Sequence, residues 1–171
     1  MMAATDLGKI AVIGSGSVGL FYGGKLAAQG ADVRFLMRSG FDEASRRGIA
    51  IHSVEGGDVW LRRPAIFRNV REIGLCDLVI VALKTTSNDA LEELIPPLLG
   101  RRTLLLTLQN GLGNEEFLAN RFGEERVLGG VCFVCLTRRS PACVDHFGHG
   151  MLSIGEFAES RTSRASSIVA A

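Results

Sequence analysis

The sequence lacks the features that would place the protein in a membrane, in a secretory pathway or on a nucleic acid. Its 171 residues contain no apolar run long enough to cross a bilayer, and the N-terminus lacks the basic-then-apolar order of a secretion signal. Charge is nearly balanced, with 19 Lys and Arg residues against 18 Asp and Glu residues and a net charge of +1. We therefore predict a cytoplasmic protein with no membrane or nucleic-acid partner.

The arginines give no sign of a basic stripe. They include four adjacent pairs that lie far apart in the sequence: Arg46-Arg47, Arg62-Arg63, Arg101-Arg102 and Arg138-Arg139. Pairs so dispersed do not predict a nucleic-acid surface, and we interpret most of them as solvated charges.

Cysteine is also scarce. The sequence holds four cysteines and one CxxC spacing, Cys132 to Cys135, with no second CxxC and no HxxxH to complete a set of four zinc ligands. That pair lies in an apolar segment typical of a β-strand, in which residues three apart point to opposite faces. We predict no metal site and no redox pair, and interpret the thiols as small buried apolar side chains.

What the sequence does contain is a glycine pattern near its N-terminus, between an apolar strand segment and an apolar helical segment. In the dinucleotide fingerprint the first glycine turns the chain out of the strand and the second lets the backbone approach a pyrophosphate. The third lets helix and strand pack closely. The phosphates would lie at the positive end of a helix starting near residue 17. We predict cofactor contacts at Gly14, Ser15, Gly16, Ser17, Val18 and Gly19. The alternative is a glycine turn that serves packing alone.

The end of the second apolar segment indicates which dinucleotide is bound. An NAD site places a carboxylate about 20 residues beyond the glycines, where it binds the ribose 2′-hydroxyl and would repel the 2′-phosphate of NADP. The sequence has Arg38 there, whose fork of donors suits a phosphate, followed by Ser39 and Gly40. We therefore predict NADP(H) rather than NAD(H). The alternative is an ordinary solvated arginine at a strand end.

Short apolar runs alternate with helical patterns, which is the order of a parallel sheet with helices on both faces. We predict a single α/β domain with a Rossmann-like doubly wound parallel sheet. An antiparallel extension near the C-terminus, two strands around a turn within 143–155, is expected to close the sheet edge. The expected strands are 9–14, 32–37, 77–82, 103–107 and 127–134, the expected helices are 18–29, 89–99 and 115–122, and 48–68 is expected to form short strands turning at Gly56-Gly57.

Two polar residues follow predicted strands at the edge where ligands bind in open α/β sheets. Lys84 comes directly after an apolar strand, so its ammonium can reach a cofactor hydroxyl or a substrate carboxylate, unless it simply points to water. Asn110 follows the next strand, where its amide would reach a carbonyl or hydroxyl near the nicotinamide. Because Asn-Gly is also a common turn pair, a plain turn stays an alternative here.

Taken in order, these motifs resemble the N-terminal domain of the ketopantoate reductases, which use NADPH to reduce 2-dehydropantoate to pantoate on the way to coenzyme A. The resemblance covers about 9–156. It rests on GSGSVG at 14–19, LMR at 36–38, VALK at 81–84, QNGLG at 109–113, and TRR at 137–139 followed by HGMLSIG at 149–155.

The resemblance implies roles for individual residues. The family pattern gives phosphate contacts at 14–19, recognition of the 2′-phosphate by Arg38, a cofactor contact by Lys84 and a backbone contact near Thr137. It also places Asn110 where cofactor and substrate meet, so Lys84 and Asn110 are expected to support catalysis.

The resemblance further implies a missing half. In the family the general acid is a lysine of a second, helical domain. We expect 1–158 to be the dinucleotide-binding domain and 159–171 to be a linker and the start of a helix that leads to an absent C-terminal domain. The 171 residues are then expected to bind NADP(H) and to turn over little or no substrate alone.

Two other functions stay open at this point. One is an NADP-dependent dehydrogenase of another 2-keto or hydroxy acid, and the other is a non-catalytic NADP-binding module. The expected partner is a small-molecule 2-keto acid, and a second copy of the chain in a homodimer is left open.

Overall fold

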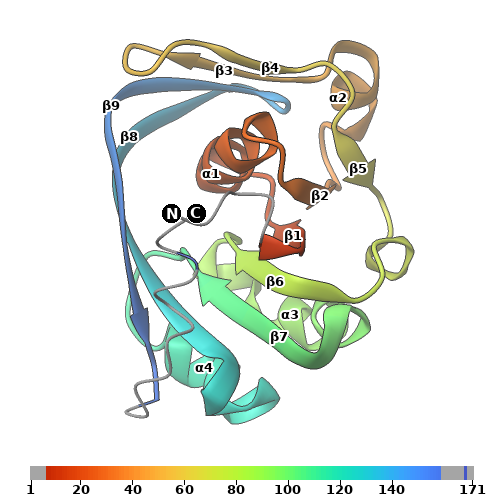
Figure 1. Ribbon diagram of the computed structural model, residues 1–171, viewed down its shortest axis with the longest axis vertical. Coiled ribbons are helices and arrows are strands. Elements are labelled where there is room, and N and C mark those ends of the chain that lie inside the picture. Colours follow the sequence, from red (N-terminus) through yellow and green to blue (C-terminus); the bar gives the residue numbers. More distant parts are fainter. Residues whose placement is uncertain (1–6, 159–167, 169–171) are drawn as a thin grey trace.

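The computed structural model describes residues 7–158 and residue 168, and its strands form a nine-stranded sheet (Figure 1). The strand order is β4-β3-β9-β8-β7-β6-β1-β2-β5. From β5 to the start of β8 every neighbouring pair is parallel, which confirms the predicted Rossmann-like sheet. The strands are β1 (Lys9–Ile13), β2 (Asp32–Leu36), β3 (Ile49–Ser53), β4 (Val59–Leu61), β5 (Ala65–Phe67), β6 (Cys76–Val81), β7 (Leu99–Thr107), β8 (Val127–Ser140) and β9 (Cys143–Glu156).

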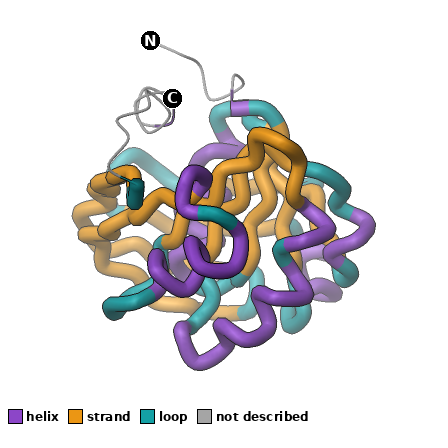
Figure 2. Tube along the Cα trace, turned by 90° about the horizontal axis from the view of Figure 1, so that it is seen from below, coloured by secondary structure: helices purple, strands orange, loops and turns teal. Residues whose placement is uncertain are grey.

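The sheet separates two apolar cores. Along β1, Ile10 and Val12 join one core while Ala11 and Ile13 join the other, so a continuous apolar run is buried on both faces. The first core contains side chains of α1, and the second contains side chains of α3 and α4. Seen at a right angle to Figure 1, the strands run through the middle of the molecule with helices packed against them (Figure 2). The α-helices are α1 (Ser17–Ala28), α2 (Phe41–Arg47), α3 (Leu91–Leu94) and α4 (Asn114–Phe122).

The sheet curls around α1. Figure 1 shows β3 and β4 above this helix and the long β8–β9 hairpin beside it, and α1 contacts all four of these strands. The phenol of Tyr22 on α1 lies 3.4 Å from the carbonyl oxygens of Gly150 and Met151 on β9. The helix is therefore held between the central strands and the curled end of the sheet.

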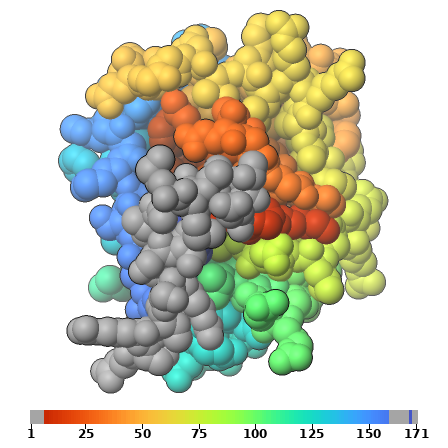
Figure 3. Space-filling view, in the orientation of Figure 1, coloured from red at the N-terminus to blue at the C-terminus, as the bar shows by residue number. Residues whose placement is uncertain are grey.

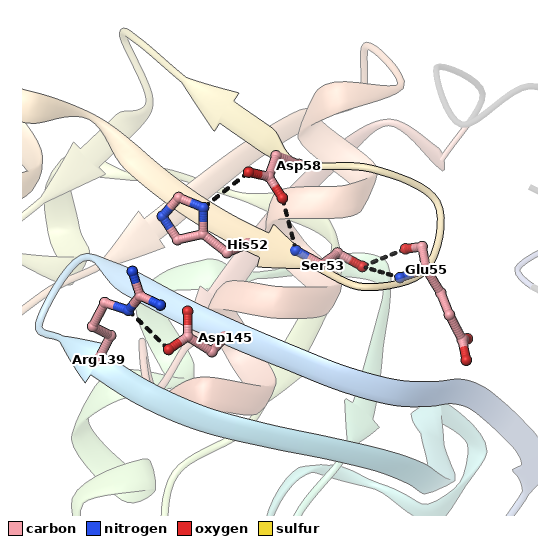
Figure 4. Close-up of polar contacts among 6 residues, drawn as sticks. All are labelled: His52, Ser53, Glu55, Asp58, Arg139 and Asp145. Atoms are coloured by element: carbon pink, nitrogen blue, oxygen red, sulfur yellow. Dashed lines mark hydrogen bonds and ion pairs between the residues drawn. The ribbon is translucent and has the colours of Figure 1, made fainter.

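Polar contacts fix this curled end (Figure 4). One Asp58 oxygen lies 2.9 Å from His52 Nδ1, and the other accepts a hydrogen bond of 2.9 Å from the Ser53 amide. Hydrogen bonds from His52 and then Ser53 hold the pKa of Asp58 below its usual range. Across the β8–β9 hairpin, Arg139 Nε lies 2.8 Å from an Asp145 oxygen. The Asp58 contacts close the turn between β3 and β4, which contains Gly56-Gly57 as predicted, and Ser53 Oγ, 2.7 Å from His146 Nδ1, joins the end of β3 to β9.

The predicted helix 89–99 is wrong in extent. The segment is a 3-10 helix over Thr85–Ala90, the single turn of α3, and a 3-10 helix over Pro96–Leu98. Ile95 keeps helical backbone and still donates to the Leu91 carbonyl at 3.0 Å, but Pro96 and Pro97 have no backbone N–H, so the α-helical hydrogen bonds end there. Further 3-10 turns span Val70–Glu72 and Glu124–Arg126.

The predicted turn within 143–155 is also wrong. The chain reverses earlier, at Pro141-Ala142, and β9 then runs as one strand that pairs antiparallel with β8 and parallel with β3. The segment Gly148-His149-Gly150 is a register shift in the ladder, with a φ of 68° at His149. The edge strands are consequently β4 and β5, and β9 lies within the sheet.

One helix was missing from the sequence prediction, and one predicted segment falls outside the described residues. The sequence did not predict α2, which follows β2. The expected linker and helix start at 159–171 lie outside the described residues except for residue 168. Among the residues that the structure describes, no helix is long and apolar enough to span a membrane.

Candidate functional site

Four strands end side by side at one edge of the sheet. Ile13 at the end of β1 pairs with Leu36 on β2 and with Val81 on β6, and Val81 in turn pairs with Thr107 on β7. The ladder continues just past these ends, where the Ala82 amide donates to the Ile13 carbonyl at 2.8 Å. The segments that leave these four strands therefore emerge from the same edge, which is where open α/β sheets bind ligands.

The three fingerprint glycines differ in what surrounds them. Gly14 has a φ of 103°, and a Cβ on it would lie 2.5 Å from the carbonyl carbon of Ala82. A Cβ on Gly19 would lie 2.2 Å from the Gly14 carbonyl oxygen, so α1 packs directly against the loop. Gly16 has a φ of −81°, and a Cβ there would meet nothing within 4 Å. Two of the glycines are thus required by the fold, and the third faces open space.

That open space adjoins the first turn of α1. The helix begins at Ser17 with Gly16 as its N-cap, no side chain caps it, and its first turn carries no acidic residue. The amides of Ser17, Val18 and Gly19 have no carbonyl partner within the helix, and the helix dipole is positive at this end. The arrangement fits the phosphates of a dinucleotide, because the space that a Cβ would fill at Gly16 is free.

Ser15 has a role that the sequence did not indicate. Its side chain is buried, and its Oγ donates a hydrogen bond of 2.8 Å to the Leu36 carbonyl at the end of β2. This bond fastens the glycine loop to the neighbouring strand. The hydroxyl is directed away from the open space, so only the backbone of Ser15 faces a ligand there.

Arg38 follows β2 by two residues. The Met37 amide still donates to the Phe67 carbonyl at 2.9 Å, which extends the pairing of β2 with β5 up to this point. The Arg38 side chain is exposed and has no hydrogen bond or ion pair within the described residues. The structure thus provides a free guanidinium beside the end of β2, next to the strand that leads into the glycine loop.

Lys84 and Asn110 follow the other two strands of this edge. Both are exposed, and neither side chain has a hydrogen-bond partner in the part of the chain that the structure describes. Beyond Asn110 the turn passes through Gly111 and Gly113, with φ of 100° and 86°. The predicted grouping of the glycine loop, Arg38, Lys84 and Asn110 at one sheet edge matches what the strand register gives.

A network of side-chain amides joins the loops after β6 and β7, and sequence reasoning missed it. Gln109 Nε2 donates to Asn88 at 2.7 Å, and Asn88 donates to the buried Asn114 at 3.2 Å. Asn114 in turn donates to the carbonyls of Asn110 and Gly111 at 3.3 and 3.2 Å. The network holds the turn that presents Asn110. Gln109 belongs to the QNGLG motif, but no motif marks Asn88 or Asn114, and the loops that hold them lie more than 20 residues apart.

Thr137 lies elsewhere on the sheet. It is exposed on β8, where it pairs with Asp145, eight residues beyond the position that pairs with the end of β7. Eight residues of strand extend over roughly 26 Å. The hairpin tip that follows returns to the segment after β2, where Ser140 bonds Glu43. The tip also packs on Gly40, where a Cβ would lie 2.5 Å from Pro141, so this end of the hairpin lies near the segment that carries Arg38. The contact near Thr137 stays a prediction.

With this geometry established, comparison with known proteins decides the family. A family model described as ketopantoate reductase PanE/ApbA matches residues 10–159. The chain belongs to the ketopantoate reductase family. A 2-dehydropantoate 2-reductase of Nostoc sp. is 37% identical over 150 residues, covering 88% of this chain and 47% of the relative.

Solved structures of ketopantoate reductases agree with the fold. The 2-dehydropantoate 2-reductase of Geobacter metallireducens has a TM-score of 0.92 and 45% identity, covering 95% of this chain and 54% of that one. A ternary structure of D-mandelate dehydrogenase with NADH and anilino(oxo)acetate has a TM-score of 0.82 and 22% identity, covering 94% and 52%, which is a likeness of fold. The chain spans about half the length of these relatives and corresponds to the N-terminal domain of the family.

The four cysteines lie apart from this sheet edge. Cys132 is half-buried on one face of β8 and Cys135 is exposed on the other, which confirms the predicted opposite faces. The interpretation of the thiols as buried side chains is wrong for Cys135 and holds fully for Cys76 alone. Burial raises the pKa of the Cys132 thiol. Within 7–158 and at 168, no three His, Cys, Asp or Glu residues gather as a metal site would require.

Proposed function

We propose that this chain forms the NADP(H)-binding half of a 2-dehydropantoate 2-reductase. The observation that carries the proposal is the meeting of the glycine loop, Arg38, Lys84 and Asn110 at one sheet edge. It is supported by 37% identity to the Nostoc enzyme and 45% identity to the Geobacter enzyme. The family makes the substrate a 2-keto acid and the product a 2-hydroxy acid.

The residues of the edge suggest how the cofactor would be held. The free amides at the start of α1 would bind the pyrophosphate over Gly16. The unpaired guanidinium of Arg38 would bind the 2′-phosphate, where a carboxylate would repel it. The proposal for NADP(H) over NAD(H) rests on this one side chain.

The same edge carries the polar groups for the substrate. NADPH, when bound, supplies the hydride that reduces the ketone carbon. Lys84 would offer its ammonium to a cofactor hydroxyl or to the substrate carboxylate, and Asn110 would donate its amide where cofactor and substrate meet. Lys9 starts β1 at the opposite edge, and Lys25 lies more than two turns into α1. Lys84 is thus the one lysine of the described residues at this edge, and we propose that the proton donor belongs to the other half of the relatives' chain.

Nucleotide titration tests the proposal. We expect NADPH to bind more tightly than NADH, measured by calorimetry, and Arg38→Ala to remove that preference. A guanidinium–phosphate contact contributes about 1.5–3 kcal/mol, so NADPH affinity should fall about ten-fold to a hundred-fold while NADH affinity changes little. Arg102→Ala removes an exposed arginine at the start of β7 and serves as the matched control. Equal binding of both nucleotides by the unaltered chain would contradict the assignment of NADP(H).

Enzyme turnover tests the proposal that this chain binds the cofactor while the proton donor belongs to the other half of the relatives' chain. The purified 171-residue chain should show little reduction of 2-dehydropantoate with NADPH, since the proposed proton donor is absent. Steady oxidation of NADPH by this chain with 2-dehydropantoate would refute that part of the proposal and leave the cofactor assignment standing.

A further inference from the structure

Two arginine pairs that are distant in the sequence meet in the fold. Arg46 and Arg47 form the last turn of α2, and Arg62 and Arg63 follow β4. The helix end and the strand end are packed together, because a Cβ on the intervening Gly48 would lie 2.1 Å from the carbonyl oxygen that precedes Arg62. The four arginines and Trp60 line a hollow of about 540 Å³. Figure 3 shows the strand end at residues near 60 in yellow along the upper rim of the molecule, beside the orange end of α1.

The charge of this arginine hollow is uncompensated. Within the described residues none of its four guanidiniums forms an ion pair, and no carboxylate lines the hollow. The acids nearest in sequence are engaged elsewhere: Asp42 pairs with Arg68, Glu43 accepts a hydrogen bond from Ser140, and Asp58 pairs with His52. Four like charges around one hollow repel one another unless an anion lies between them.

Trp60 shapes one wall of the hollow. Its indole nitrogen donates a hydrogen bond of 2.8 Å to the Arg47 carbonyl, and the Arg62 guanidinium lies 5.2 Å from the centroid of its ring. The stacking holds the Arg62 head group by its face and leaves its N–H donors at the rim free. A second hollow of about 680 Å³ shares Trp60, Arg62 and Arg63 and continues toward the end of α1.

We propose that the arginine hollow is a binding site for a small molecule that carries two or more phosphate groups. Guanidinium forks match phosphate oxygens, and the volume is that of a small-ligand pocket. The site is separate from the nucleotide edge. Arg62 and Arg63 precede β5, which runs parallel to β2, so they lie where these strands begin, whereas the glycine loop lies where β1 ends.

A simpler explanation covers only half of the cluster. Arg46 and Arg47 end a helix, where positive charge is stabilised by the helix dipole. Arg62 and Arg63 lie in a connection between strands and have no such role. If Arg46 and Arg47 only stabilise the helix end, their removal should leave phosphate binding unchanged, whereas removal of part of a binding site should weaken it.

Calorimetric titration with sodium tripolyphosphate at low ionic strength tests the proposal, with tryptophan emission recorded in parallel. Trp60 is the one tryptophan of the 171 residues, so a change in emission locates binding at the hollow. The test variant is Arg46→Ala/Arg47→Ala, which keeps the backbone carbonyl that holds the indole. The matched control is Arg101→Ala/Arg102→Ala, which removes an equal charge from an exposed pair on β7.

We expect saturable binding with a change in Trp60 emission, weakened about ten-fold or more in the test variant and unchanged in the Arg101/Arg102 control. Thermal unfolding of each variant shows that it is folded. The proposal is overturned if no saturable binding is seen, or if binding weakens equally in the Arg101/Arg102 control. It is also overturned if the test variant has a lower Tm but unaltered affinity, because that result is expected when Arg46 and Arg47 only stabilise the end of α2. Tighter binding of a 20-base-pair DNA duplex with the same dependence on Arg46 and Arg47 would assign the surface to nucleic acid instead.

Discussion

Single alanine substitutions at the fingerprint glycines should separate folding from nucleotide binding. At Gly14 the φ of 103° is strained for alanine, which costs about 1–3 kcal/mol. The 2.5 Å approach of its Cβ to the Ala82 backbone adds roughly 1–3 kcal/mol of overpacking. A total of about 3 kcal/mol corresponds to a fall in Tm of roughly 6–12 °C in a domain of this size. In Gly19→Ala the new Cβ would lie 2.2 Å from the Gly14 carbonyl oxygen, so we expect its Tm to fall by a similar amount.

Gly16→Ala should behave in the opposite way. Its backbone is extended and its Cβ meets nothing within 4 Å, so only the poorer N-cap costs stability, at most about 1 kcal/mol. The added methyl lies in the space that the proposed pyrophosphate requires, so NADPH affinity should fall about ten-fold or more, or 1.4 kcal/mol. Thermal unfolding by circular dichroism and NADPH titration measure the two effects. The reasoning is refuted if Gly16→Ala loses as much stability as Gly14→Ala, or if it binds NADPH as the unaltered chain does.

Two further predictions concern groups outside the glycine loop. Asn114→Ala removes the two hydrogen bonds that its buried amide donates to the carbonyls of Asn110 and Gly111. At about 0.5–1.5 kcal/mol for each bond this should cost about 1–3 kcal/mol, seen as a lower Tm in the same unfolding assay; an unchanged Tm would show that the amide network is not needed to hold this turn. Cys76 is 5% exposed, and burial raises the pKa of its thiol to about 11. At pH 8 iodoacetamide should therefore modify the exposed Cys135 first and Cys76 last, which peptide mass spectrometry would measure. A reversed order would contradict the burial of β6.

The parts of the structure that the sequence predicts are those with local signals. The continuous apolar run of β1, the glycine turn and the helix that follows all lie within 20 residues of chain. Arg38, Lys84 and Asn110 could be placed at one edge because parallel strands bring their carboxyl ends together whatever their order in the sheet. The strand order itself, with β9 between β3 and β8, was not predicted.

The parts that were missed depend on contacts between distant segments. Gly148 and Gly150 suggest a turn, yet β9 continues through them because its residues before and after them pair with β8. The start of β9 also pairs with β3, about 90 residues earlier in the chain. Tertiary pairing here outweighs the local preference of glycine for turns. Likewise, the inward direction of the Ser15 hydroxyl depends on the end of β2, which no local pattern reveals.

The two opposite edges of the sheet also explain why one proposed anion site has a sequence motif and the other has none. Where the strands end, helices such as α1 begin, and their free amides bind an anion through the backbone, so a short glycine pattern suffices. Where the strands begin, helices end and present carbonyl oxygens, which repel anions. An anion site at that edge must therefore be built from charged side chains. In this chain those side chains come from α2 and from the connection after β4, so only the folded structure brings Arg46 and Arg47 together with Arg62 and Arg63.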